Sequence, residues 1–199
     1  QDAWPWESDP AKWEVQLKKT LKTLFFFHFI ATPALIVGDV MLEQNKVRVD
    51  TETLPGIGEI LGQILFCMIV EDFTFYWGHR MLHHPKLYPH IHKIHHEYNI
   101  TVSIASEYAH PLEILVANIL PTALGAKILG SKMHILTYFM WLVIRVMETC
   151  DGHCGYEFSW SPYRLLPLSG SSNYHNFHHY QNVGNYGSFF TLWDTICGT

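Results

Sequence analysis

Three clusters of histidine at helical spacing constrain this chain more than any other feature. They are His79-x-x-x-His83, His92-x-x-His95-His96 and His175-x-x-His178-His179. Residues at positions i, i+3 and i+4 share one face of a helix, so each cluster is expected to turn its imidazole rings toward one point. Histidine contributes 14 of 199 residues, a content at which chance does not produce three such spacings. The pattern predicts helices that carry metal ligands.

The number of clustered rings predicts how many ions they bind. Eight imidazoles exceed the needs of one ion, since zinc takes about four ligands and octahedral iron about six. Two ions are therefore expected. Imidazole suits iron, zinc, copper and nickel, so ligand chemistry alone leaves the metal open. His153, which follows the last apolar segment, is expected as a ninth ligand.

Several other polar residues are expected beside the ligands. Neutral imidazoles leave the charge of a dication uncompensated, so a carboxylate is expected to offset it and to fix the ring tautomers. Asp72 lies seven residues before His79, two helical turns back on the same face, and is expected to contact a ligand or the metal. A helix-capping role is its alternative. His84 and His110 are also expected beside the ligands. Further candidate carboxylates are Glu97, Glu107 and Asp151. His28 and His134 are expected to be structural, and His90 is expected to lie in a loop.

Composition predicts an all-α fold in a membrane. Apolar residues make up 48% and charged residues 16%, against about 25% charged in soluble domains. We expect an integral-membrane bundle of about four transmembrane helices with a histidine-rich helical cap, although buried helices of a soluble bundle look similar. Pro121 is expected to kink the third helix. The apolar segments are 24–37, 57–70, 111–129 and 133–147.

The order of these segments predicts the side on which the cap lies. Two crossings separate the second cluster from the third, so all clusters return to one side. Lysine and arginine are in excess on that side, which favours the cytosol. The tryptophans of residues 1–17 are expected either at the membrane interface or in an arm packed on the surface.

Charge and cysteine content exclude other classes of protein. A net charge of −5 with no basic stripe argues against binding of nucleic acid. The four cysteines have no regular spacing, so we expect reduced thiols rather than a disulfide framework. Cys150 and Cys154, with His153 between them, lack the second cysteine pair of a structural zinc site.

The three histidine clusters resemble those of the fatty acid hydroxylase superfamily of membrane oxygenases. The chain is most similar to the sterol 4-methyl oxidase (methylsterol monooxygenase) branch, and the similarity covers about residues 60–199. It divides the chain into an arm with a first membrane helix, residues 1–56, and a di-metal oxygenase domain, residues 57–199. Besides the clusters, it is carried by Glu71-Asp72, Glu97, Glu107-Tyr-Ala-His110-Pro111-Leu-Glu113, Gly184-Asn185-Tyr186 and Trp193-Asp194.

The resemblance implies a function. It implies four membrane helices with a cytosolic cap, two non-haem iron ions, dioxygen, and electrons from NAD(P)H through a reductase and cytochrome b5. The implied reaction is stepwise oxidation of a methyl group at sterol carbon 4, in the endoplasmic reticulum. The positions that match the family's metal ligands are His79, His83, His92, His95, His96, His175, His178 and His179, with His153 beside them.

Alternatives remain within and outside this class. A fatty-acyl hydroxylase or desaturase, a zinc-loaded protein without redox activity, and a structural subunit of a membrane complex derived from the enzyme are each compatible with the sequence. The mitochondrial inner membrane is the alternative location. Aromatic residues of the apolar segments are expected to guide a lipid substrate or simply to pack; they are Phe25, Phe26, Phe27, Phe73, Phe75, Trp77, Phe139 and Trp141.

Overall fold

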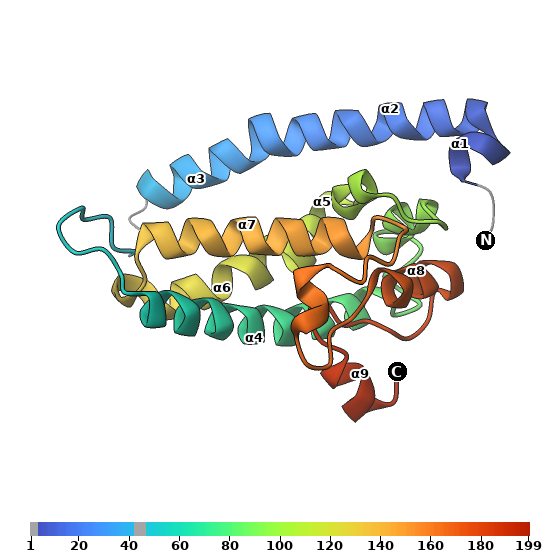
Figure 1. The fold of residues 1–199 in the computed structure, drawn as a ribbon. Helices are drawn as coiled ribbons and strands as arrows, with labels where there is room; N and C mark the ends of the chain where they lie inside the picture. The colour runs from blue at the N-terminus through green and yellow to red at the C-terminus, as the bar shows by residue number, and fades with distance from the viewer. Residues whose placement is uncertain (1–3, 42–46) are drawn as a thin grey trace.

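The computed structural model describes residues 4–41 and 47–199, and the described residues form helices joined by loops, with two isolated β-bridges and no strand. The predicted all-α class is confirmed. Four long helical segments run along the molecule, and the short helices gather at one end of it (Figure 1). The long segments are α2 to α3 (Pro10–Phe26 and Thr32–Met41, with Phe27–Ala31 between), α4 (Ile57–Leu82), α5 to α6 (Pro111–Glu113 and Leu120–Leu129, with Ile114–Ile119 between) and α7 (Ile135–Gly152).

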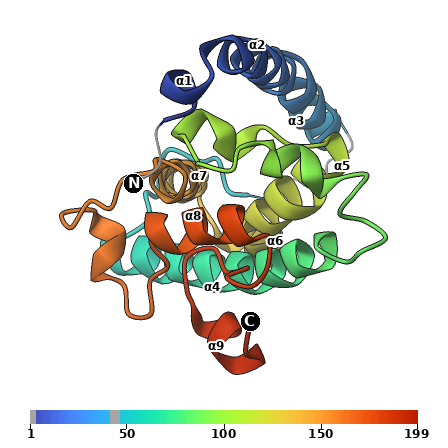
Figure 2. The same cartoon turned by 90° about the vertical axis from the view of Figure 1, so that its right-hand side faces the viewer.

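Short helices build the cap at that end. The single turn α1 (Pro5–Ser8) precedes α2, and α8 (Ser172–Gln181) lies across the ends of the long helices (Figure 2). α9 (Leu192–Cys197) closes the chain. Two 3₁₀ helices, His92–Glu97 and Ser103–Glu107, connect α4 to α5, and a third, Pro162–Leu165, lies between α7 and α8. A fourth, Gly130–Lys132, joins α6 to α7 at the other end of the bundle (Figure 1).

Both proline-containing long helices widen into a π-helical segment just before the proline. Phe27–Ala31 precedes Pro33, and Ile114–Ile119 precedes Pro121. Proline lacks an N–H and its ring clashes with the carbonyl four residues earlier. A wider turn removes that clash while the helix continues.

The bundle core forms where α4, α6 and α7 pack together. Ile60, Ile64 and Met68 of α4 and Trp141 of α7 are buried in it. At Gly125 of α6, a Cβ atom would lie 2.9 Å from the Cα of Cys67, so only glycine allows this approach of the two helices. All four cysteines are free thiols, as the sequence predicted.

The surface of the bundle carries many exposed apolar side chains. Among the described residues, one helix, from Pro111 to Lys132 over 22 residues, is long and apolar enough to span a membrane. The four-crossing arrangement therefore stays a prediction. α4 nevertheless presents an outward stripe of apolar side chains at four-residue spacing, all exposed: Ile57, Leu61, Leu65, Ile69, Phe73, Trp77 and Met81.

The N-terminal helices α1 and α2 pack on the cap through aromatic side chains and one buried hydrogen bond. Trp4 stacks on Trp6, Trp6 meets Trp13 edge-on, and Trp13 meets the ring of Tyr98 at a centroid distance of 6.3 Å. The hydroxyls of Thr20 and Tyr98 are hydrogen-bonded at 2.6 Å in a buried position. The tryptophans thus form an arm packed on the cap, one of the two placements that the sequence left open.

Candidate metal centre

Four segments of the chain carry the nine histidines expected to bind metal. The last turn of α4 and its C-cap supply His79 and His83, and the end of α7 supplies His153. Ser171 caps the N-terminus of α8, because its hydroxyl accepts from the N–H of Tyr174; this helix carries His175, His178 and His179. The second cluster, His92–Glu97, is a 3₁₀ helix and not the α-helix that the spacing suggested. Residues at i and i+3 eclipse in this tighter helix, yet the ring nitrogen of His92 lies with that of His96, at i+4, and not with that of His95.

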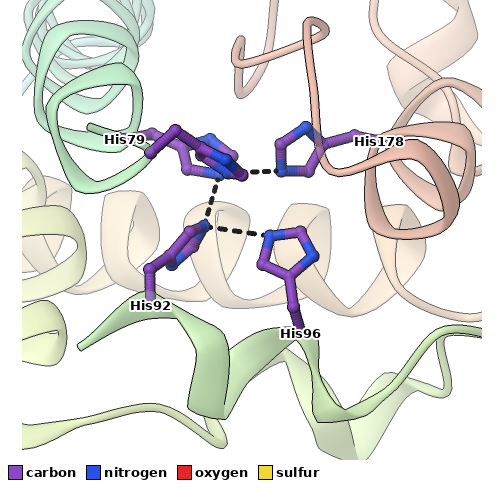
Figure 3. Close-up of side chains that lie close together, drawn as sticks. His79, His92, His96 and His178 are labelled. Atoms are coloured by element: carbon purple, nitrogen blue, oxygen red, sulfur yellow. Dashed lines mark hydrogen bonds between the residues drawn. The ribbon is translucent and has the colours of Figure 1, made fainter. Parts of the chain in front are cut away.

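The nine rings gather in two groups, and in each group the ring nitrogens lie within 4.8 Å of one another. Figure 3 shows four members of the first group pointing toward one another. The groups are neighbours, since the rings of His96 and His179 have centroids 4.5 Å apart. The first group is His79, His83, His92, His96 and His178; the second is His95, His153, His175 and His179.

The division between the groups follows a simple rule. Residues spaced i and i+4 stay together, as His92 does with His96 and His175 does with His179. The i+3 residue of each box belongs to the other group: His95 lies with His175 and His179, and His178 lies with His92 and His96. Each His-x-x-His-His box therefore contributes to both groups, which the sequence reasoning had not anticipated. The two groups form one interlocked site.

Backbone carbonyls fix the tautomer of most rings. A carbonyl oxygen only accepts hydrogen bonds, so the Nδ1 atom that faces it carries the proton and the Nε2 atom keeps its lone pair. The Nδ1 atoms of His79, His95, His153, His178 and His179 lie 2.6–3.1 Å from carbonyl oxygens. The carbonyls belong to Tyr186, Tyr108, Thr149, Gly184 and Tyr98.

The Nε2 atoms then face one another closely. Those of His79 and His92 are 3.1 Å apart, and those of His95 and His153 are 3.3 Å apart. Two lone pairs share no proton and repel unless a cation lies between them. Two nitrogens bound at about 2.1 Å to one metal, at angles of about 90–110°, lie about 3.0–3.4 Å apart. The residues present therefore fit a metal ion in each group.

Burial keeps the rings neutral and ready to bind metal. It lowers the pKa of His83 and of His95 to about 4. Burial, followed by repulsion from neighbouring imidazoles, holds the pKa of His175 and His179 well below the usual value. Metal ligands must be deprotonated, so this environment favours binding of a cation over binding of protons.

One functional carboxylate escaped the sequence reasoning. The Nδ1 atom of His92 lies 2.7 Å from Oε1 of Glu113, and the two side chains are 1% and 5% exposed. Glu113 thus gives His92 the carboxylate partner that neutral ligands call for. Its only sequence signal is its place at the end of the stretch Glu107-Tyr-Ala-His110-Pro111-Leu-Glu113.

The structure does not bring Asp72 to the ligands. The Asp72 carboxylate is buried and accepts from the N–H of Phe190 at 2.9 Å, so it holds the C-terminal segment against α4. Asp72 lies two helical turns before His79, where α4 contacts the C-terminal segment around Phe190.

His84 and His110 also lie away from the metal groups. His84 is exposed and its Nδ1 accepts from the N–H of Lys86. His110 caps the N-terminus of α5 by accepting from the N–H of Leu112. Both rings serve the local backbone.

The remaining candidates serve packing. Glu97 accepts from the hydroxyl of Tyr108, Glu107 pairs with His28, and Asp151 pairs with Arg164. His90 is exposed, whereas His134 caps α7.

A small pocket of about 30 Å³ reaches the second group. His153 and His175 form part of its wall, and Phe75, Arg145 and Glu148 form another part.

The other aromatic residues expected to guide a lipid or to pack differ in burial. Trp141 is buried in the core, whereas the exposed ones are Phe25, Phe26, Phe73, Trp77 and Phe139.

Comparison with known proteins agrees with the site. The model of the fatty acid hydroxylase family matches residues 64–199. Methylsterol monooxygenase 2-2 of Arabidopsis thaliana is 39% identical over 173 residues, which are 83% of this chain and 64% of that protein. Methylsterol monooxygenase 1 of Gallus gallus is 39% identical over 191 residues, 96% of this chain and 63% of that protein.

A relative with a different name is similar over an equal length. Very-long-chain aldehyde decarbonylase GL1-11 of Oryza sativa subsp. indica is 46% identical over 174 residues, 83% of this chain and 64% of that protein. The chain thus spans slightly less than two thirds of the length of these relatives. No solved structure matches it. The family match and these relatives, together with the three histidine clusters, establish that the chain belongs to the fatty acid hydroxylase family.

Proposed function

We propose that this chain is the metal-bearing part of a di-iron membrane oxygenase that uses dioxygen to oxidise a methyl group on a sterol-like lipid. The observation that carries the proposal is the convergence of nine histidines into two adjoining groups of ring nitrogens. Imidazole does not choose between iron and zinc. Iron is favoured by family membership and by the redox chemistry that the related enzymes' names describe.

The chain's own residues prepare the site for that chemistry. His79, His83, His92, His96 and His178 would hold one ion and His95, His153, His175 and His179 the other. When bound, the two irons supply the electrons that split dioxygen, which an unactivated C–H bond requires. The carbonyls and Glu113 hold the rings in the tautomer that points Nε2 inward. Burial of the rings excludes water from the site.

The apolar surface supports contact with a bilayer and a lipid substrate. The outward stripe of α4 is exposed along its length, and only 33% of the apolar window in Pro111–Lys132 is buried in the protein. Exposed apolar surface of this extent marks a contact with a membrane or with another protein. A lipid substrate would then approach from the membrane. We propose the endoplasmic reticulum as the location, with the mitochondrial inner membrane as the alternative, and electrons from NAD(P)H through cytochrome b5 or a similar carrier.

A long-chain aldehyde is the second candidate substrate. The rice relative named as a very-long-chain aldehyde decarbonylase is 46% identical, against 39% for the two methylsterol monooxygenases. The metal ligands do not discriminate between these substrates, because both reactions would use the same centre.

Metal analysis and product analysis test the proposal together. Two irons per chain with a Mössbauer spectrum of coupled non-haem iron would support it, whereas a metal-free or zinc-only protein would refute it. The purified protein is then incubated with a 4-methylsterol or a long-chain aldehyde, NADPH, reductase and cytochrome b5. A 4-hydroxymethyl sterol supports the lead proposal, and a shortened hydrocarbon supports the second.

A further inference from the structure

A buried cluster of charges lies in the bundle beside the second histidine group. Arg145 donates from Nε to Oε1 of Glu71 at 2.6 Å and from Nη1 to Oε2 of Glu148 at 2.9 Å. The side chain of Glu71 is 0% exposed and that of Arg145 is 6% exposed. The second oxygen of Glu71 is buried and has no hydrogen-bond partner. Asp72, the neighbour of Glu71, is also buried.

The charges of this cluster do not balance. One guanidinium pairs with Glu71 and Glu148, and Asp72 adds a third carboxyl group close to both acids. Charged groups around this cluster also include Glu107, Asp151, Glu157 and Arg164. Arg164 pairs with both Asp151 and Glu157, so it adds no spare positive charge. An uncompensated carboxylate inside a protein is costly and is normally neutralised by a proton. Before metal binds to the histidine groups, the cluster therefore holds at least one protonated carboxyl group.

The pocket connects this cluster to the metal ligands. Glu148 and Arg145 line it, and so do His153 and His175 of the second group. The hydroxyl of Ser188 also lines the pocket and donates to Oε1 of Glu71 at 3.3 Å. Polar groups thus extend from the protonated cluster to the histidine side of the pocket.

We propose that Glu148 donates protons into this pocket for the reduction of dioxygen beside His153 and His175, and that Glu71 shares the proton with it through Arg145. The inference rests on the proposed oxygenase function. In that reaction one oxygen atom enters a C–H bond, the O–O bond breaks, and the other oxygen leaves as water with two protons. The two electrons come from a one-electron carrier protein. Glu148 supplies protons and takes up replacements from solvent.

Infrared difference spectroscopy tests the buried proton directly. We compare the wild-type chain with Glu148→Gln and with Glu59→Gln, which alters a carboxylate on the exposed side of α4. Glu148→Gln should lose the C=O stretching band of one protonated carboxyl group, because one of the two carboxyl groups that share the proton is gone and Glu71 alone ionises against Arg145. Glu59→Gln should keep the band. An unchanged band in Glu148→Gln overturns the proposal, and the measurement needs no bound metal.

Turnover tests the role of that proton. In the iron-loaded protein, Glu148→Gln should lower turnover by about 100-fold or more and release a larger share of the consumed dioxygen as hydrogen peroxide. Its iron content should stay that of the wild type. Glu148→Asp keeps the acid and should restore part of the turnover and of the coupling. Full turnover and coupling in Glu148→Gln would overturn the proposal. A wild-type chain that binds no iron refutes the proposed function instead, and the infrared result still decides the buried proton.

Discussion

The Nε2 atoms of His79 and His92 lie 3.1 Å apart although each ring has already committed its Nδ1 proton to another acceptor. His79 donates to the carbonyl of Tyr186 and His92 to the carboxylate of Glu113. Two lone pairs therefore point at one position from two helices. The same arrangement recurs at His95 and His153 in the second group. This contact is unfavourable without a cation, so the fold is expected to depend on metal.

His95→Ala and His178→Ala should each remove one ion from a different group. His95 belongs to the four-membered group and His178 to the five-membered group. Metal content should fall from two ions to about one in each variant and to none in the double variant, as measured by plasma emission on purified protein. His84→Ala is the control, because that ring is exposed and lies outside both groups. Equal retention of two ions in all variants would contradict the ligand assignment.

Glu113→Gln should weaken one metal site selectively. The amide oxygen still accepts from His92, so the tautomer is kept while the negative charge is lost. Loss of such a partner lowers metal affinity by about 10- to 100-fold. Competition with a chromophoric chelator should show this change for one equivalent of metal and not for the other. Glu107→Gln is the matched control, since Glu107 pairs with His28 and with no predicted ligand. A loss shared by both equivalents would show that Glu113 acts on the fold as a whole.

The metal-free protein should lose stability as the pH falls from about 6.5 toward 4. In the folded chain the pKa of His83 and of His95 is lowered to about 4 by burial. Between these values the unfolded chain binds more protons than the folded chain, so the free energy of unfolding decreases as the pH decreases. Urea unfolding in detergent at pH 7 and pH 5 measures the difference. If the free energy of unfolding rose on acidification, the buried imidazole rings could not be neutral in the folded chain.

At neutral pH, bound metal should raise the free energy of unfolding, because an ion that binds only the folded state stabilises it by about 4 kcal/mol at a thousandfold excess over Kd.

Gly125→Ala should destabilise the bundle although alanine is the better helix former. The new Cβ atom would lie 2.9 Å from the Cα and Sγ of Cys67, which would push α6 away from α4. Overpacking of this kind costs about 1–3 kcal/mol. Gly62→Ala on the same bundle meets nothing within 4 Å and should be neutral or stabilising. Thermal unfolding of both variants checks the contrast. Equal stability of the two variants would mean that α4 and α6 can separate at no cost.

The sequence by itself determined which histidines of one helix lie together, because that depends only on local helical geometry. Spacing of i and i+4 keeps His79 with His83 and His175 with His179, because neighbouring turns of one helix place them together. The apolar segments and the all-α class follow from composition and periodicity in the same way. Which elements carry the clusters was predicted less well, since His92–Glu97 forms a 3₁₀ helix.

Only the tertiary structure decided which rings meet across elements. His95 and His178 cross to the group opposite that of their own box, and Glu113 reaches His92 from 21 residues away in the chain. Asp72 turns instead toward Phe190. These choices depend on how α4, α7 and α8 pack, and contacts between distant segments are set by the packing of whole helices rather than by spacing along the chain.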